Sequence, residues 1–169
     1  MTVKEKHHLI ENFRRAIDEV ESHLKGTDAK AWDFIPPIAD AWPIRAQVAH
    51  LLDADMYTWA RIRKSVAQSG AAVDVWDQEA WAARLDYERA DVPRTLDHCR
   101  IVRDALADFL ESIIGEDWDG FAINHPERGR TDLASMLAFY VEHVAFHLDL
   151  IDRNLKAFRS AGSPGAKAR

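Results

Sequence analysis

The sequence is poor in several features that mark particular classes of protein. It has one cysteine, Cys99, which excludes an intramolecular disulfide and is typical of proteins of the reducing cytoplasm, where we expect this chain. It has 7 Gly and 6 Pro, too few for a loop-rich β-fold. We find no apolar run long enough to span a bilayer and no signal-peptide pattern at the N-terminus. The formal net charge of −6 does not favour a nucleic-acid partner.

What the 169-residue chain does contain is helical periodicity. Apolar residues recur at helical spacing in four long segments, so we expect helices over about residues 4–24, 43–68, 91–115 and 131–158. Asp91 and Thr131 are placed to cap the third and fourth helices, Pro43 suits the first turn of the second, and Gly115 can end the third.

The segments between these helices have little periodicity. Residues 28–42 contain Pro36-Pro37 and indicate an extended connector, 76–87 indicate a short helix, and 118–130 indicate a turn-rich loop. We find no internal repeat and no convincing strand. The pattern predicts an all-α four-helix bundle with a long crossover connection that contains a short extra helix. The bundle domain should cover residues 1–159, and residues 160–169 should form a flexible C-terminal tail.

Two histidines four residues apart, His143 and His147, stack on one face of the fourth predicted helix. They share this face with Met136, Tyr140 and Ile151, so the pair points into the bundle. Imidazoles in a core are costly unless they are hydrogen-bonded or bind a metal, and neutral imidazole suits Zn²⁺, Ni²⁺ and Fe²⁺. The pair alone leaves both interpretations open.

A third histidine, His50, lies in the middle of the second predicted helix. A bundle can bring it level with His143 and His147, and three neutral imidazoles with open coordination positions make a catalytic type of site. The small neighbours Ala46 and Ala54 would leave room for a metal and a ligand. The alternative is a partly exposed helix histidine with no ligand role.

One acidic residue, Asp55, falls on the apolar row of the same helix, where a carboxylate should be paired or bound. It could bind the ion, orient a metal ligand, or form an ion pair with Arg100 or Arg103 across the core. The structural ion pair is the favoured interpretation.

Three segments together resemble the DinB superfamily, the YfiT-like metal-binding four-helix proteins. They are residues 42–55 (WPIRAQVAHLLDAD), Trp118 followed by residues 125–130 (HPERGR), and residues 142–151 (EHVAFHLDLI). Their order and spacing agree with the family from about Leu9 to Leu155. The resemblance implies that His50, His143 and His147 bind one divalent metal ion.

The resemblance carries further expectations. Asp55 stands where the family often has Glu, and its shorter side chain argues against a role at the metal. The family is frequently homodimeric, and Trp76 and Trp81 in the crossing connection are candidates for an exposed aromatic interface. Some members are transferases or isomerases that use a low-molecular-weight thiol, such as bacillithiol or mycothiol.

Three functions therefore compete. The first is a metal-dependent enzyme, specifically a thiol-dependent S-transferase acting on a small molecule, in which the metal favours loss of the thiol proton. The second is a metal-dependent hydrolase that uses a metal-bound water, for which Asp55 is the one candidate general base that the sequence indicates to be buried. The third is a non-enzymatic ligand-binding or stress-related bundle protein. An open coordination position favours chemistry, whereas four protein ligands close the site.

Overall fold

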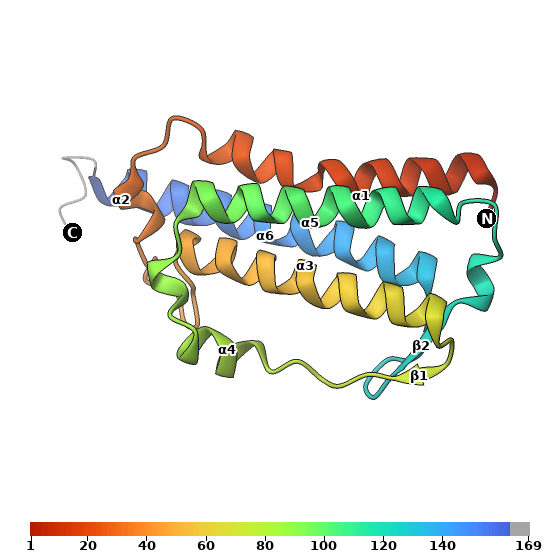
Figure 1. The fold of residues 1–169 in the computed structure, drawn as a ribbon. Coiled ribbons are helices and arrows are strands. Elements are labelled where there is room, and N and C mark those ends of the chain that lie inside the picture. Colours follow the sequence, from red (N-terminus) through yellow and green to blue (C-terminus); the bar gives the residue numbers. More distant parts are fainter. Residues whose placement is uncertain (163–169) are drawn as a thin grey trace.

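Four long helices lie side by side in the computed structural model, which describes residues 1–162 (Figure 1). They are α1 (Val3–Leu24), α3 (Ile44–Ala67), α5 (Val92–Ser112) and α6 (Leu133–Gly162). The connections add the short helices α2 (Ala29–Trp32) and α4 (Gln78–Arg84), and the 3₁₀ turns η1 (Tyr87–Arg89) and η2 (Trp118–Gly120). The predicted four-helix bundle is confirmed.

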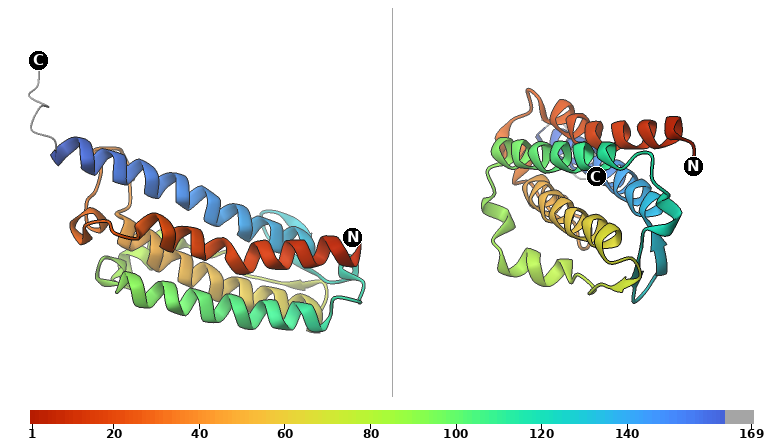
Figure 2. Two further views of the ribbon diagram at one scale, coloured as in Figure 1. Left: turned by 90° about the horizontal axis from the view of Figure 1, so that it is seen from above. Right: turned by 45° about the vertical axis from the view of Figure 1, so that its right-hand side comes forward.

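The topology requires one long return of the chain. Helices α1 and α6 run in one direction and α3 and α5 in the other, and both α1 and α3 pack against α5 and α6 (Figures 1 and 2). Because α3 and α5 are parallel, the segment between them must travel back along the bundle, and it does so beside α3 with α4 and η1 on its way (Figure 1). This is the predicted crossover, with its short helix inside the expected range 76–87.

Side-chain caps explain where most of the long helices begin. Thr2 and Glu5 form a capping box at α1, and the Asp91 carboxylate accepts the Arg94 backbone N–H at the start of α5, as predicted. At α3, Pro43 stands one residue before the helix. The prediction that Thr131 caps the last helix is wrong: Asp132 accepts the backbone N–H of Ser135, at 2.8 Å.

A small sheet occurs where no strand was expected. Strand β1 (Ala71–Ala72) pairs in parallel with β2 (Ala122–His125), which pairs antiparallel with β3 (Gly129–Asp132). Thr131 and Asp132 both pair with β2, and because α6 begins at Leu133, Asp132 and not Thr131 is the residue directly before the helix. The strands are too short to show a period in the sequence. The β2–β3 hairpin turns through residues 126–128, and Gly129 supplies the positive φ of 71° that this turn needs.

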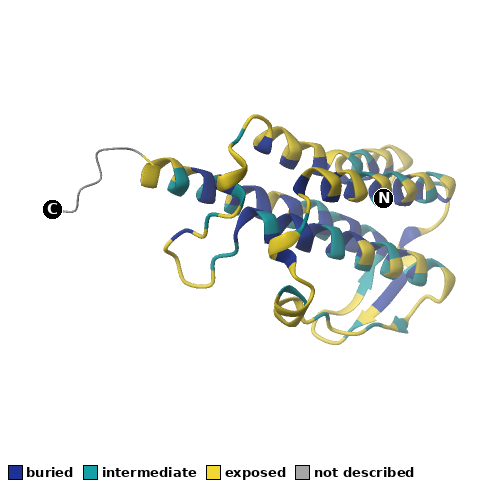
Figure 3. Cartoon of the chain, turned by 60° about the vertical axis from the view of Figure 1, so that its left-hand side comes forward, coloured by how far each residue is buried: buried dark blue, intermediate teal, exposed yellow. Residues whose placement is uncertain are grey.

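The core lines the inner faces of the four helices (Figure 3). One cluster occupies the end that holds the C-terminal half of α1 and the start of α3, and a second occupies the end with the sheet. Among the helices of residues 1–162, α6 alone is long and apolar enough to cross a membrane by length and composition. This corrects the expectation that no segment reaches that threshold, and the packing of α6 against α1 and α3 accounts for its apolar residues.

Two boundaries differ from the predictions. The connector over 28–42 is not wholly extended, because Asp28 caps the short helix α2. Helix α6 continues through Gly162, so residues 160–162 of the predicted tail are helical. The rest of that tail, 163–169, lies outside the described residues.

Candidate metal centre

Three histidines meet between two helices of the bundle. His50 comes from α3, and His143 and His147 come from successive turns of α6, which packs against α3. One ring nitrogen of each lies within 4.8 Å of the others. The Nε2 atoms of His50 and His143 are 3.1 Å apart. Within residues 1–162 this is the one group of His, Cys, Asp or Glu placed to hold a metal ion.

The site keeps these imidazoles neutral. His50 and His147 are 1% and 5% exposed, and His143 is half-buried. Burial lowers the pKa of His50 to about 3, of His143 to about 4 and of His147 to about 2. The second cause is the neighbouring histidines for His50 and His147, and the charges of Arg103 and Arg128 for His143. Each ring therefore has an unprotonated nitrogen lone pair at neutral pH, which is the form that binds metals.

A buried glutamine sets the tautomer of one ring. The Gln47 side chain, 1% exposed, donates from Nε2 to the backbone carbonyl of Trp42 at 3.2 Å. Its Oε1 therefore faces His147 Nδ1, 3.3 Å away, and must accept a hydrogen bond from the Nδ1–H group. Neutral His147 then carries its lone pair on Nε2. Metal-binding histidines are commonly oriented by such a hydrogen bond from their second nitrogen.

The donor set fits a divalent ion. Three neutral imidazole nitrogens from two helices match the ligands of catalytic zinc sites, which leave a position for water or substrate. His50 Nδ1 is buried and has no hydrogen-bond partner among the described residues. Three buried or half-buried imidazoles that turn ring nitrogens toward one point are costly in an ordinary core, so the cluster is better explained as a binding site than as packing.

Aromatic side chains cover His50 on the crossover side. The Trp76 ring stacks on His50, with centroids 4.9 Å apart and planes at 9°, and Tyr57 stacks on the far face of this pair, 4.9 Å from Trp76. Trp42 contacts His50 edge-on at 5.4 Å. Trp81 packs against Trp76 and Tyr57. The two crossover tryptophans considered for a dimer interface are thus half-buried, and Trp76 forms a wall of the site.

Two cavities open onto the histidines from different sides. The first, the hairpin cavity, measures about 160 Å³ and is bordered by His50, His143 and residues of the β2–β3 hairpin. The second, the connector cavity, measures about 410 Å³ and reaches all three histidines from the side of Trp42 and Phe146. Both are bordered by His50, Gln78, Phe139 and His143, so they meet at the cluster.

The family model of the DinB superfamily matches residues 12–151 of this sequence. The chain belongs to the DinB superfamily. Proteins of Bacillus cereus and Bacillus thuringiensis named "Putative metal-dependent hydrolase" are 26% identical over 130 residues, covering 77% of this chain and 73% of theirs. A relative from Bacillus mycoides with that description is 26% identical over 134 residues.

A solved structure agrees in fold across most of the chain. YfiT from Bacillus subtilis, described as "a probable metal-dependent hydrolase with an unusual four-helix bundle topology", superposes with a TM-score of 0.82 at 20% identity. The match covers 96% of this chain and 91% of YfiT. It shows that this DinB protein has the same bundle topology.

The acidic residue near the site has a structural role instead. Asp55 is fully buried and accepts two hydrogen bonds from Arg103, at 2.6 and 2.8 Å. The favoured interpretation is confirmed with Arg103, whereas Arg100 pairs with acidic residues on the surface. Five residues along a helix turn the side chain by about 140°, so Asp55 and His50 face different ways. Asp55 is therefore unsuited to serve as a base or a ligand at the histidines.

The sequence predicted that the three histidines lie together, but it did not predict most of the residues that surround them. Gln47 was visible as a polar neighbour of His50, three residues before it and on the same side of the helix. Arg61 and Tyr140 border the hairpin cavity and are hydrogen-bonded to each other at 3.2 Å. Arg128 reaches the cavity because of the hairpin, in a segment whose sequence indicated only turns.

Proposed function

We propose that this DinB protein is a metal-dependent enzyme that transfers a low-molecular-weight thiol to an electrophilic small molecule. One observation carries the proposal: two separate cavities meet at a cluster of three neutral histidines. A transfer needs two organic substrates to approach one point, and each cavity can admit one of them.

Different residues of the site would hold the metal, orient a metal ligand and exclude water. His50, His143 and His147 would hold one divalent ion, for which Zn²⁺, Ni²⁺ and Fe²⁺ suit imidazole nitrogen. Such an ion lowers the pKa of a thiol or water bound beside it, and so supplies a nucleophile at neutral pH. Gln47 fixes His147 in the tautomer that offers Nε2, while Trp76 and Tyr57 exclude water from one face of His50.

In the transfer itself the thiol gives its proton to water and its sulfur forms a bond to an electrophilic carbon, while the leaving group departs from that carbon with the electron pair of the broken bond. The aromatic rings of Trp76 and Phe139 give the electrophile an apolar surface in the hairpin cavity. Low-molecular-weight thiols are intracellular reductants, so we place the protein in the cytoplasm, which agrees with its free, buried Cys99. We also expect the homodimer that the family resemblance implies, to be measured by light scattering.

Hydrolysis is the second candidate, favoured by the description shared by the Bacillus relatives. It would need a base other than Asp55. Glu127 borders the hairpin cavity and Glu79 borders the connector cavity, and both are exposed to water.

One assay separates these functions. Metal-loaded protein is incubated with a panel of electrophiles and esters, with and without mercaptoethanol and cellular thiols, and the products are identified by mass spectrometry. Thiol adducts that form faster than without protein, and only with His50 intact, are the expected result. Hydrolysis without thiol would replace the proposal with the second candidate. Binding of these compounds without turnover would leave the non-enzymatic interpretation.

A further inference from the structure

The hairpin cavity is bordered by two arginines that have no acidic partner. Arg61 comes from α3 and Arg128 from the β2–β3 turn. No ion pair within residues 1–162 includes either guanidinium, whereas Arg14, Arg45 and Arg103 each pair with an acidic side chain. An arginine whose charge is unmatched at the wall of a cavity is available for an anion that enters it.

Internal contacts hold the first guanidinium in place. Arg61 donates from Nη1 to the Tyr140 hydroxyl at 3.2 Å and from Nη2 to the Asp74 carbonyl at 2.7 Å, and it lies over the Tyr57 ring at 5.1 Å. All three partners are neutral, so they position the charge without cancelling it. A guanidinium has five N–H donors, and these bonds leave others free.

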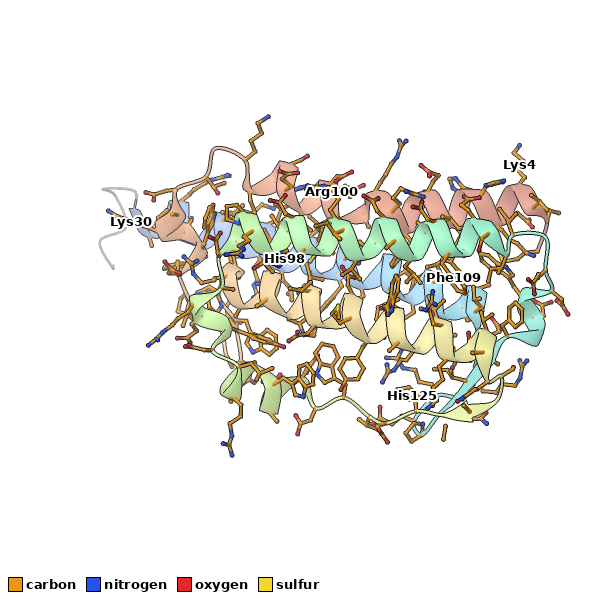
Figure 4. The ribbon with its side chains drawn as sticks, viewed as in Figure 1. Lys4, Lys30, His98, Arg100, Phe109 and His125 are labelled. Atoms are coloured by element: carbon orange, nitrogen blue, oxygen red, sulfur yellow. The ribbon has the colours of Figure 1, made fainter. Side chains whose placement is uncertain are left out.

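The second guanidinium rests on an aromatic ring. Arg128 lies 3.9 Å from the centroid of Phe139, and it has no hydrogen bond or ion pair among the described residues. Phe139 in turn stacks on His143, with centroids 6.0 Å apart. This stack joins Arg128 to the metal centre. The hairpin also carries His125, labelled in Figure 4, on the side of the bundle away from α1.

The balance of charge in the cavity is positive. Glu127 is the one carboxylate among the residues that border it, and it pairs with neither arginine. Burial first, and then the positive charges of Arg61 and Arg128, lowers the pKa of His125, so both charges act inside the cavity. The remaining wall is apolar, with Val75, Trp76, Ile123 and Met136.

We infer that the hairpin cavity binds the anionic group, such as a carboxylate, of a small molecule that reacts at the three histidines, and that Arg61 and Arg128 are its binding residues. The reaction of this molecule at the three histidines rests on the proposed function, whereas the binding of an anion in the hairpin cavity does not depend on it. The rest of such a molecule would lie on Trp76 and Phe139. The anion belongs either to the electrophile or to the thiol.

Binding is tested by calorimetry on the metal-loaded protein with benzoate and with benzamide, which differ in charge and little in size. The parent should prefer benzoate. Arg61→Gln and Arg128→Gln should each weaken benzoate binding about 10- to 100-fold, the loss expected for a hydrogen bond to a charged group, and should not change benzamide binding. Arg61→Lys, which keeps the charge, should lose less than Arg61→Gln.

Matched controls exist on the same elements. Arg63, two residues from Arg61, lies over Trp59 and Phe109 outside the cavity, and Arg130 of the hairpin donates to the Asp119 carbonyl. Arg63→Gln and Arg130→Gln should bind benzoate as the parent does. Thermal unfolding checks that Arg61→Gln keeps its fold. Arg128 is exposed and makes no hydrogen bond within residues 1–162, so its variant tests the inference without that concern. If all variants bind benzoate equally, as they would if benzoate bound to the metal alone, the inference is overturned.

Turnover identifies the source of the anion. With mercaptoethanol, rates for bromoacetate and bromoacetamide are compared; with bromoacetamide, rates for mercaptoacetate and mercaptoethanol are compared. A faster rate with the anionic compound of a pair, lost in Arg128→Gln, supports the inference. If this is seen in the first pair the anion belongs to the electrophile, and if it is seen in the second pair the anion belongs to the thiol. Arginine-dependent benzoate binding without any turnover would retain the anion site and reject the proposed function.

Discussion

Replacing Asp55 by asparagine separates a structural from a functional role for the buried acidic residue. Asp55 and Arg103 are 0% and 1% exposed, and two hydrogen bonds of 2.6 and 2.8 Å join them. Asp55→Asn keeps the volume but leaves the Arg103 charge without a counter-charge in the core. Breaking a buried pair in this way costs about 3–5 kcal/mol.

This loss is large beside the total stability of a domain, which is typically about 5–15 kcal/mol. For a chain of this size it corresponds to a fall in Tm of roughly 6–20 °C. Urea unfolding and calorimetry measure both quantities, and zinc titration of the same variant measures the site. We expect zinc affinity to stay near that of the parent, because Asp55 faces away from His50.

Two controls define the result. Asp97→Asn removes a partner of Arg100 in an exposed network and should cost less than about 1 kcal/mol. The double variant Asp55→Leu/Arg103→Met replaces both charges by apolar groups and should recover most of the loss. Unchanged stability of Asp55→Asn, together with lost zinc binding, would refute the structural role and return Asp55 to the metal site.

Three further predictions concern the metal centre. Chelation should leave most of the helical circular dichroism, because none of the three core clusters contains any of the three histidines; complete loss would mean that the metal is structural. The metal-free protein should lose stability as pH falls below about 6.5, by up to about 1.4 kcal/mol per pH unit for each histidine, because imidazoles of the unfolded chain take up protons there. The native histidines do not take up protons in this pH range, because their pKa values in the folded protein are about 2 to 4. In a variant that lacks all three histidines, the free energy of unfolding measured with urea should not show this dependence on pH. Gln47→Ala should weaken zinc binding about 10- to 100-fold by freeing His147, as judged by calorimetry, and an unchanged affinity would exclude the orienting role.

The parts of this structure that depend on local sequence could be predicted, and those that depend on distant contacts could not. Apolar periodicity gave the four long helices, and the spacing of His143 and His147 placed both on the inner face of α6. Thr131 was misassigned because its neighbour Asp132 has the same capping chemistry, and the choice between them depends on the residue at which α6 begins.

The residues that surround the three histidines could not be predicted from local sequence patterns. The burial of His50 depends on Trp76, which reaches it through the crossover, and no spacing rule connects the two. Arg61 and Arg128 are brought to one cavity by the β1–β2–β3 sheet, whose strands are two to four residues long. Asp55 could have been assigned from the sequence, because its angular offset from His50 is a property of any helix.

Zinc titration of the metal-free protein and five histidine variants tests the central claim most directly. The parent should bind one Zn²⁺ per chain, and His50→Ala, His143→Ala and His147→Ala should each lose more affinity than the roughly 100-fold expected for losing a residue that only orients a ligand. His23→Ala and His98→Ala should bind as the parent does, because both side chains are exposed and neither belongs to the cluster of three; His98 lies on α5 (Figure 4), which contributes no residue to it. If His50→Ala binds zinc as tightly as the parent, α3 contributes no ligand and the three-histidine centre is wrong.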